Sequence, residues 1–310
     1  MEKVDVYYQS RDGVNIHSQL WKSEAKPRAI VQIAHGMAEH IERYDHFARF
    51  LVENDCFVYG NDHRGHGKTA AAKEQLGYFS DERGFDIVVE DMLQLTNMIE
   101  KKHPQTPIIL FGHSMGSFLA RRLIQMEGTK YSGVILSGTG GDPGWLGKVG
   151  IWLAAREVKK KGKKAESPLL EKAIFGSHNK SFKPNRTEFD WLSRDESEVD
   201  KYIEDPLCGN KSKAGFFLDL LTGISAINKM EWINQIPKDL PIYLFSGDQD
   251  PVGNFSKGVL QVFKSYVDAG IKDVTYKLYP NGRHEMLNEL NKEEVYKDIL
   301  NWMNEKLSQH

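Results

Sequence analysis

A serine between two glycines is the clearest candidate for chemistry in this sequence. Ser114 is the middle residue of Gly-His-Ser-Met-Gly, residues 112–116, which follows an apolar run that predicts a strand (residues 107–111) and precedes a helical pattern (residues 118–124). A serine in such a turn projects its hydroxyl above the sheet, and the glycines remove side chains that would collide there. We predict that Ser114 is a nucleophile; a glycine-rich turn that only closes the connection is the alternative.

A serine hydroxyl needs a histidine to accept its proton and a carboxylate to orient that histidine. The histidines after Ser114 are His178, His284 and His310. His284 follows a predicted strand (residues 274–279) in a glycine-containing loop, where a base should lie if the order is serine, acid, histidine. His178 falls in a segment that interrupts the strand pattern, and His310 is terminal, so we predict that His284 is the base.

Two aspartates follow the predicted strand that ends at Phe245. Asp250 is favoured as the acid because it is further from the strand end and precedes the Pro251-Val252 turn. Asp248 is expected to accept hydrogen bonds from backbone amides of the turn instead.

Acyl transfer also needs two backbone amides that receive the negative charge of the transition state. One is predicted to be the amide of Met115, directly after the serine. The other is predicted to be the amide of Met37, in the loop of residues 35–40, where Gly36 lets the backbone approach. A simple turn between a strand and a helix is the alternative for this loop.

The elements that must position these groups alternate between short apolar runs and longer amphipathic ones, which is typical of a mostly parallel α/β sheet. An opening antiparallel hairpin is predicted over residues 4–8 and 15–21. Strands buried on both faces are predicted at residues 29–34, 56–60, 107–111 and 133–137, and the strand pattern resumes at residues 241–246 and 274–279. Amphipathic helices are predicted at residues 44–53, 84–102 and 292–307.

The middle of the chain breaks this alternation. A glycine- and proline-rich stretch, residues 138–144, marks the boundary, and the residues that follow read as helices and loops without a convincing buried strand. We predict a helical cap over residues 140–235, inserted in a core made of residues 1–139 and 236–310. This segment is called the cap segment below.

Composition excludes several classes of protein. The 310 residues carry 41 basic and 43 acidic side chains, a formal net charge of −2, which provides no global attraction to nucleic acid. The mean hydropathy of −0.51 and the lack of a long apolar run argue against a membrane span, and the N-terminus does not resemble a signal peptide. Cys56 and Cys208 are expected to be free thiols in a reducing, cytoplasmic compartment. The lysine-rich run at residues 159–164 is expected to be a solvated helix end, with contact to an anionic membrane surface as the alternative.

Two look-alike motifs carry no predicted function. Residues 65–69 resemble the end of a phosphate-binding loop, but Asp62 stands where its first glycine is required. Four histidines at positions 35, 40, 63 and 66 lack the spacing of a zinc site. We expect no metal and no organic cofactor.

Taken together, residues 35–40, 43–44, 62–67, 112–117, 247–252 and 282–285 resemble the monoacylglycerol lipase and lysophospholipase branch of the α/β-hydrolases. The similarity covers residues 5–305, and residues 191–195 and 205–208 look like the bacterial members. The resemblance implies an eight-stranded, mostly parallel sheet with helices on both faces, a catalytic triad of Ser114, Asp250 and His284, and oxyanion donors at Met37 and Met115. Ala38 departs from the pattern, because the animal lipases usually have glycine there.

The predicted substrate is a lipid-like ester, a monoacylglycerol or a lysophospholipid. Gly36, Trp145, Trp152 and Phe216 are predicted to bind it, although apolar residues at this spacing also suit plain helix packing. A short-chain carboxylesterase is one alternative. A serine aminopeptidase is another, with an acidic subsite drawn from Glu39, Glu196 and Glu198, and a non-catalytic binding protein on the same fold is a third. No oligomeric state follows from the sequence.

Overall fold

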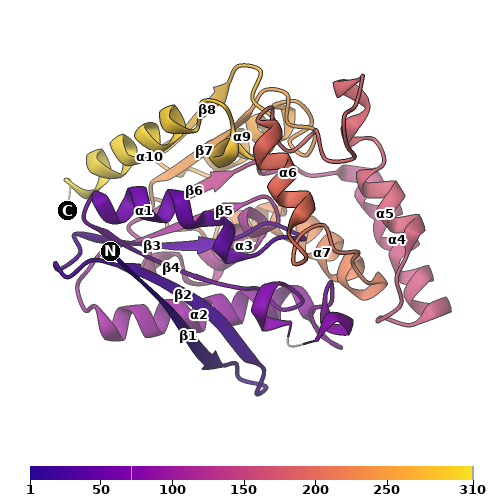
Figure 1. Ribbon diagram of the computed structural model, residues 1–310, viewed down its shortest axis with the longest axis horizontal. Coiled ribbons are helices and arrows are strands. Elements are labelled where there is room, and N and C mark those ends of the chain that lie inside the picture. Colours follow the sequence, from indigo (N-terminus) through magenta and orange to yellow (C-terminus); the bar gives the residue numbers. More distant parts are fainter. Residues whose placement is uncertain (71, 309–310) are drawn as a thin grey trace.

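Eight strands form one sheet in the order β1-β2-β4-β3-β5-β6-β7-β8 (Figure 1). The structure is a computed structural model that describes residues 1–70 and 72–308. β1 and β2 form an antiparallel hairpin, β2 pairs antiparallel with β4, and the other neighbours are parallel. The strands are β1 (Glu2–Gln9), β2 (Asn15–Lys22), β3 (Ala29–Ala34), β4 (Cys56–Asn61), β5 (Ile108–His113), β6 (Gly133–Ser137), β7 (Ile242–Gly247) and β8 (Val274–Tyr279).

Continuous apolar runs explain the central strands. β3 to β7 are buried over their whole length, as expected for parallel strands that are covered on both faces. The predicted hairpin and the predicted parallel strands are confirmed. β5 extends beyond its predicted end at residue 111 to His113, so the strand ends directly before Ser114.

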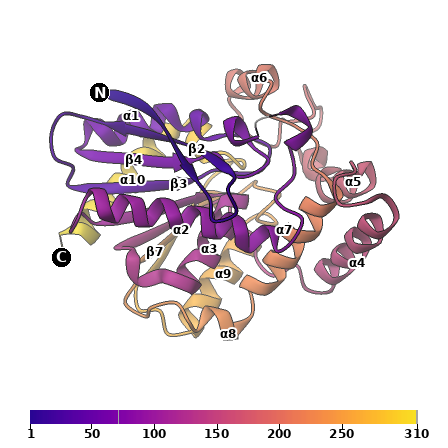
Figure 2. The same ribbon diagram turned by 90° about the horizontal axis from the view of Figure 1, so that it is seen from below.

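Helices cover both faces of the sheet (Figures 1 and 2). α1 (Asp45–Glu53) and α10 (Lys292–Leu307) share one buried apolar cluster with the sheet. α2 (Gly84–Lys102), α3 (Met115–Glu127) and α9 (Lys257–Asp268) share another. The clusters contain side chains from both faces of β3 and β5, which holds the carboxyl ends of these strands in fixed positions.

Five α-helices and one short 3-10 helix (His178–Phe182) lie between β6 and β7, within the segment predicted as a cap. The α-helices are α4 (Gly144–Lys161), α5 (Pro168–Phe175), α6 (Glu196–Glu204), α7 (Ala214–Ile227) and α8 (Met230–Ile233). α4, α5, α6 and α7 lie together beyond one end of the sheet, on the right of Figure 1. α7 also packs against α2 and α3, and its side chains Phe216, Phe217 and Leu220 belong to the same apolar cluster as those helices.

The structure also bears on the expectations about membrane spans and cysteines. No described helix has the length and apolar character needed to cross a bilayer. Cys56 and Cys208 are both buried free thiols.

Candidate active site

Ser114 occupies the turn between β5 and α3. Its backbone has φ 50° and ψ −119°, a conformation that residues other than glycine rarely adopt. A Cβ atom on Gly116 would lie 2.0 Å from the carbonyl oxygen of Ala34, and one on Gly112 would lie 2.5 Å from the carbonyl oxygen of Gly116. Both glycines are therefore required by close backbone approach, and the turn presents the serine above the sheet.

His284 and Asp250 form a buried pair at the ends of the neighbouring strands. The Nδ1 atom of His284 lies 2.9 Å from Oδ1 of Asp250. The carboxylate of Asp250 also accepts hydrogen bonds from the Ser246 hydroxyl and the N–H of Val252, each at 2.9 Å. Asp248, in contrast, accepts the backbone N–H of Asn281 at 2.9 Å; it binds a backbone amide as predicted, but one in the loop after β8 and not in its own turn.

The two partners shift each other's pKa. Burial lowers the pKa of His284, but the charge and hydrogen bond of Asp250 outweigh burial, so the pKa of His284 lies above its usual value. Burial raises the pKa of Asp250, and the charge and hydrogen bond of His284 more than reverse this effect. Because Nδ1 faces the carboxylate, the neutral imidazole carries its proton on Nδ1 and keeps a lone pair on Nε2.

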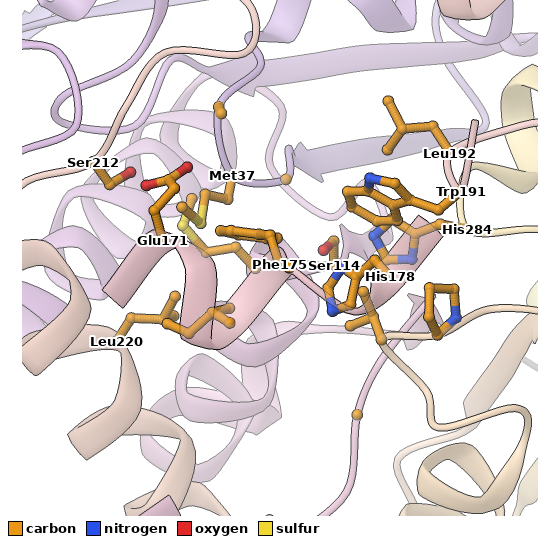
Figure 3. A pocket seen from close by; sticks show the side chains of 18 of the residues that line it. Met37, Ser114, Glu171, Phe175, His178, Trp191, Leu192, Ser212, Leu220 and His284 are labelled. Carbon is orange, nitrogen blue, oxygen red and sulfur yellow. The ribbon is translucent and has the colours of Figure 1, made fainter. Parts of the chain in front are cut away.

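Ser114 and His284 line one cavity of about 1180 Å³ (Figure 3). The loop of residues 36–39 lines the same cavity and lies against the serine, because a Cβ atom on Gly36 would be 3.4 Å from Cβ of Ser114. Met37 is part of the lining, and Met115 is the first residue of α3, so its N–H is among those that have no partner within the helix. Both predicted donors thus belong to segments beside Ser114.

A buried ionic network lies behind this loop, and sequence reasoning did not find it. The Glu39 carboxylate accepts hydrogen bonds from the Gly36 N–H, from Tyr44 Oη at 2.8 Å and from Arg43 Nη1 at 2.6 Å. Arg43 also binds both oxygens of Glu285, at 2.7 and 2.8 Å. Burial raises the pKa of Glu39, but Arg43, together with smaller effects of His113, His35 and the Tyr44 hydrogen bond, outweighs burial and lowers that pKa to about 2. The sequence signal was the four-residue spacing of Glu39 and Arg43.

This network changes the interpretation of the predicted acidic subsite. Glu39 lines the cavity, but its carboxylate is already occupied by protein donors, the Arg43 guanidinium, the Tyr44 hydroxyl and the Gly36 N–H. Glu196 forms an ion pair with Arg186, and Glu198 binds Lys201 and Lys292; neither glutamate lines the cavity. These three residues therefore do not form the subsite for a substrate amine that the aminopeptidase alternative required.

Side chains from the cap segment cover His284. The Trp191 ring centre lies 5.1 Å from that of His284, and the Trp191 carbonyl accepts the His284 N–H at 3.4 Å. His178 lies 4.8 Å from Trp191 and lines the cavity, although sequence reasoning set it aside (Figure 3). Burial, aided by the charge of His284, lowers the pKa of His178 to about 4, so this imidazole is neutral at pH 7. His310 lies outside the described residues.

The structure brings only one of the four predicted substrate-binding residues to the cavity. Gly36 lines it, whereas Trp145 and Trp152 are 71% and 60% exposed on α4 and do not. Phe216 is fully buried with its ring centre 4.4 Å from that of Phe79. The apolar part of the wall comes from other residues: Met37, Phe118, Leu146, Phe175, Leu220 and Ile224.

The look-alike motifs have structural roles in the described residues. The Asp62 carboxylate accepts the N–H groups of Ile41 and Lys68 and would lie 2.2 Å from a Cβ atom on Gly67, so an acid fills the space that a phosphate would need. The rings of His35, His63 and His66 pack together in tilted and edge-to-face contacts. One group among the described residues, His40, Asp205 and Cys208, has ligand atoms within 4.8 Å of each other, but His40 and Asp205 are bonded directly at 2.8 Å.

Comparisons with known proteins identify the family of the chain. A family model described as "Serine aminopeptidase, S33" matches residues 25–291. The monoglyceride lipase of Rattus norvegicus is 31% identical over 94% of this chain and 86% of its own length. The monoacylglycerol lipase of Mycolicibacterium smegmatis is 28% identical over 94% of this chain and 93% of its own.

Solved structures of an esterase and a lipase share the fold of this chain. A thermostable carboxyl esterase from Bacillus coagulans, solved in complex with glycerol, is 30% identical with a TM-score of 0.92 and covers 99% of both chains. A soluble variant of the Saccharomyces cerevisiae monoglyceride lipase, in complex with a substrate analogue, has a TM-score of 0.77 at 18% identity over 97% of this chain and 94% of its own. The second likeness concerns the fold alone.

Proposed function

The chain belongs to the serine aminopeptidase S33 family and is an ester hydrolase with the α/β-hydrolase fold, and from this premise we propose that it cleaves monoacylglycerols or lysophospholipids through an acyl-enzyme on Ser114. The observation that carries the proposal is that His284 lines the same cavity as Ser114 and is bonded behind the wall to the buried carboxylate of Asp250.

In the proposed reaction, Nε2 of His284 takes the proton of the Ser114 hydroxyl while Oγ attacks the ester carbonyl carbon. The amides of Met37 and Met115 hold the oxyanion that forms. The carbon–oxygen bond to the alcohol then breaks, and the alcohol leaves with the proton from His284. Water repeats the sequence on the acyl-enzyme, which releases the acid and restores Ser114. Asp250 stabilises the imidazolium in both halves.

The cavity supports a lipid-like acyl group. Its volume of about 1180 Å³ exceeds that of common small-ligand pockets. The apolar wall, with Met37, Phe175 and Leu220 on one side of Ser114, suits an alkyl chain, and the end near Ser212 and Glu171 is polar (Figure 3). The relatives named as monoglyceride lipases support a glycerol ester as the substrate.

We also propose that residues 140–235 act as a cap over a core of residues 1–139 and 236–310. Support comes from the five α-helices between β6 and β7 and from the cap residues Phe175, His178 and Trp191 on the cavity wall. The exposed Trp145, Leu146, Val149 and Trp152 of α4 form an apolar surface next to the lysines at the end of that helix. We propose that this surface contacts anionic membranes from which the lipid substrate is taken.

Labelling with a fluorophosphonate together with a substrate panel tests the function. We expect the unmodified protein to be labelled and the Ser114→Ala variant to be neither labelled nor active, with Ser10→Ala as a control serine remote from the cavity. Rates on p-nitrophenyl esters and monoacylglycerols should rise with acyl length. A protein that is not labelled contradicts the serine mechanism, and a preference for short soluble esters contradicts the lipid substrate. Turnover of aminoacyl-arylamides in place of esters would favour an aminopeptidase.

A further inference from the structure

The carbonyl oxygen of Ala38 accepts two hydrogen bonds from residues 202–209, the end of α6 and the turn after it, here called the clamp segment. The Tyr202 hydroxyl donates at 3.0 Å, and the N–H of Gly209 donates at 2.9 Å. Tyr202 is only 6% exposed, so its hydroxyl is held among protein atoms. A carbonyl oxygen has two lone pairs, and here both are used by the cap segment.

Two more contacts join the clamp segment to the residues after Ala38. Oδ2 of Asp205 lies 2.8 Å from Nε2 of His40, and the Arg43 guanidinium lies 4.8 Å from the centre of the Tyr202 ring. A hydrogen bond and a cation–π contact thus add to the attachment that the hydrogen bonds to Ala38 make. Residues 38–43 are therefore held at several points by a part of the chain that is about 160 to 170 positions away.

Met37 lies between two anchored peptide groups. On one side, the N–H of Gly36 donates to the Glu39 carboxylate. On the other side, the Ala38 carbonyl is held by Tyr202 and Gly209. Ala38 itself has φ 55°, in the left-handed region that an L-residue seldom adopts without support. The loop conformation is thus one that the backbone does not favour by itself, and the bonds to Ala38 stabilise it.

We propose that Tyr202 is a positioning residue, which fixes the Ala38 carbonyl and thereby keeps the N–H of Met37 directed at the oxyanion. This inference rests on the proposed function, in which Met37 is an oxyanion donor. Charge on the substrate oxygen develops only in the transition state, so a misaligned donor lowers kcat and leaves KM nearly unchanged. The arrangement also couples the cap segment to the loop of residues 36–39. The clamp segment is part of the cap segment, and Ala38 is part of that loop.

The test compares Tyr202→Phe with Tyr8→Phe. The Tyr8 hydroxyl also donates to a buried carbonyl, that of Asp91, at 2.9 Å. Tyr8, however, is not one of the residues that line the cavity. We expect both variants to lose similar thermal stability. We expect only Tyr202→Phe to lose kcat, by about tenfold, or about 1.4 kcal/mol in activation free energy, with KM within about twofold of the unmodified protein.

Two substrates separate positioning from direct substrate contact, because Tyr202 also lines the cavity. A positioning role predicts the same loss of kcat on a p-nitrophenyl ester and on a monoacylglycerol. A loss confined to the monoacylglycerol would show a contact with its glycerol part and would overturn the proposal. An unchanged kcat on both substrates would overturn it as well.

A second variant covers the case in which Tyr202→Phe does not fold. Asp205→Asn weakens the attachment of the clamp segment to His40, and it should also lower kcat on both substrates without changing KM; an unchanged kcat counts against the proposal. Failure of the proposed function gives a different result, since the unmodified protein would then be neither labelled at Ser114 nor active on either ester.

Discussion

The carboxylate of Asp250 lies 2.9 Å from the imidazole of His284, and both side chains are almost completely buried. The pair is therefore shielded from water, and the attraction between its members is stronger than it would be at the surface. Asp248, two residues earlier, is bonded to the backbone of Asn281 and takes no part in this pair.

Replacing each aspartate in turn separates their roles. We expect Asp250→Asn to lower kcat by about 10³- to 10⁴-fold, because His284 would lose both its orientation and the charge that stabilises the imidazolium. Asp248→Asn should change kcat by less than about threefold, since an amide oxygen can still accept the Asn281 N–H. The measurement is steady-state hydrolysis of a p-nitrophenyl ester by both variants. Comparable losses in the two would refute the assignment of Asp250.

The raised pKa of His284 predicts the pH dependence. The base acts in its neutral form, so kcat/KM should fall as the pH drops through a pKa that lies above the usual 6.5. In Asp250→Asn the opposing effect of burial remains, and the midpoint of the residual activity should move to lower pH. Profiles of kcat/KM from pH 5 to pH 9 test this. A midpoint below 6.5 in the unmodified protein would contradict the pKa shift.

Arg43 should be essential for stability. In Arg43→Met the buried carboxylates of Glu39 and Glu285 lose their counter-charge, and we expect a loss of about 3–5 kcal/mol in urea denaturation at pH 7. The exposed pair of Arg49 and Asp45 offers a control, and Arg49→Met should cause no measurable loss.

The pH dependence of this stability follows from the same charges. In the unmodified protein the pKa of Glu39 is held at about 2, so its contribution is complete above the unfolded pKa of about 4.3 and is lost as the pH falls toward 2. Without Arg43 that pKa rises, because burial then dominates. Lowering the pH from 7 to 5 should therefore stabilise Arg43→Met, and a variant that is less stable at pH 5 would contradict this account.

The tryptophans of α4 give a test of membrane contact. Changing Trp145 and Trp152 together to serine should reduce co-sedimentation with vesicles of phosphatidylserine and phosphatidylcholine by at least about tenfold, since a membrane-bound α4 would bury both indoles. Hydrolysis of a soluble p-nitrophenyl ester should not change, because neither residue lines the cavity. Tyr7→Ser, which removes another half-exposed aromatic side chain from β1, serves as the control and should bind vesicles normally. Equal binding by the double variant would refute the contact.

The fold could be predicted in detail because its signals are local. The order and approximate positions of the strands, the glycines beside Ser114 and the turn around Asp250 follow from short patterns. The pairing of Asp250 with His284 follows from their positions after two predicted strands. The cavity wall could not be predicted in this way. Trp145 and Trp152 are side chains of the type that lines an apolar substrate-binding surface. Which side of α4 faces the cavity, however, depends on how that helix packs against α7. Trp191 and His178 cover His284 from about 90 and 105 positions away, so no local pattern marks them.

The packing of α7 against α2 and α3 bears on how this protein could be rebuilt. Phe216, Phe217 and Leu220 share an apolar interior with the sheet and its helices, although they lie within residues 140–235. Exchanging that whole segment for the corresponding one of a relative would therefore replace part of the interior, and the chimaera would need to be matched there. A chimaera that exchanges only residues 144–204, which carry α4, α5 and α6, would keep α7 on α2 and α3 while replacing Trp191, His178 and Tyr202 over the cavity, and only the face of α7 that packs on α4 would need to be matched.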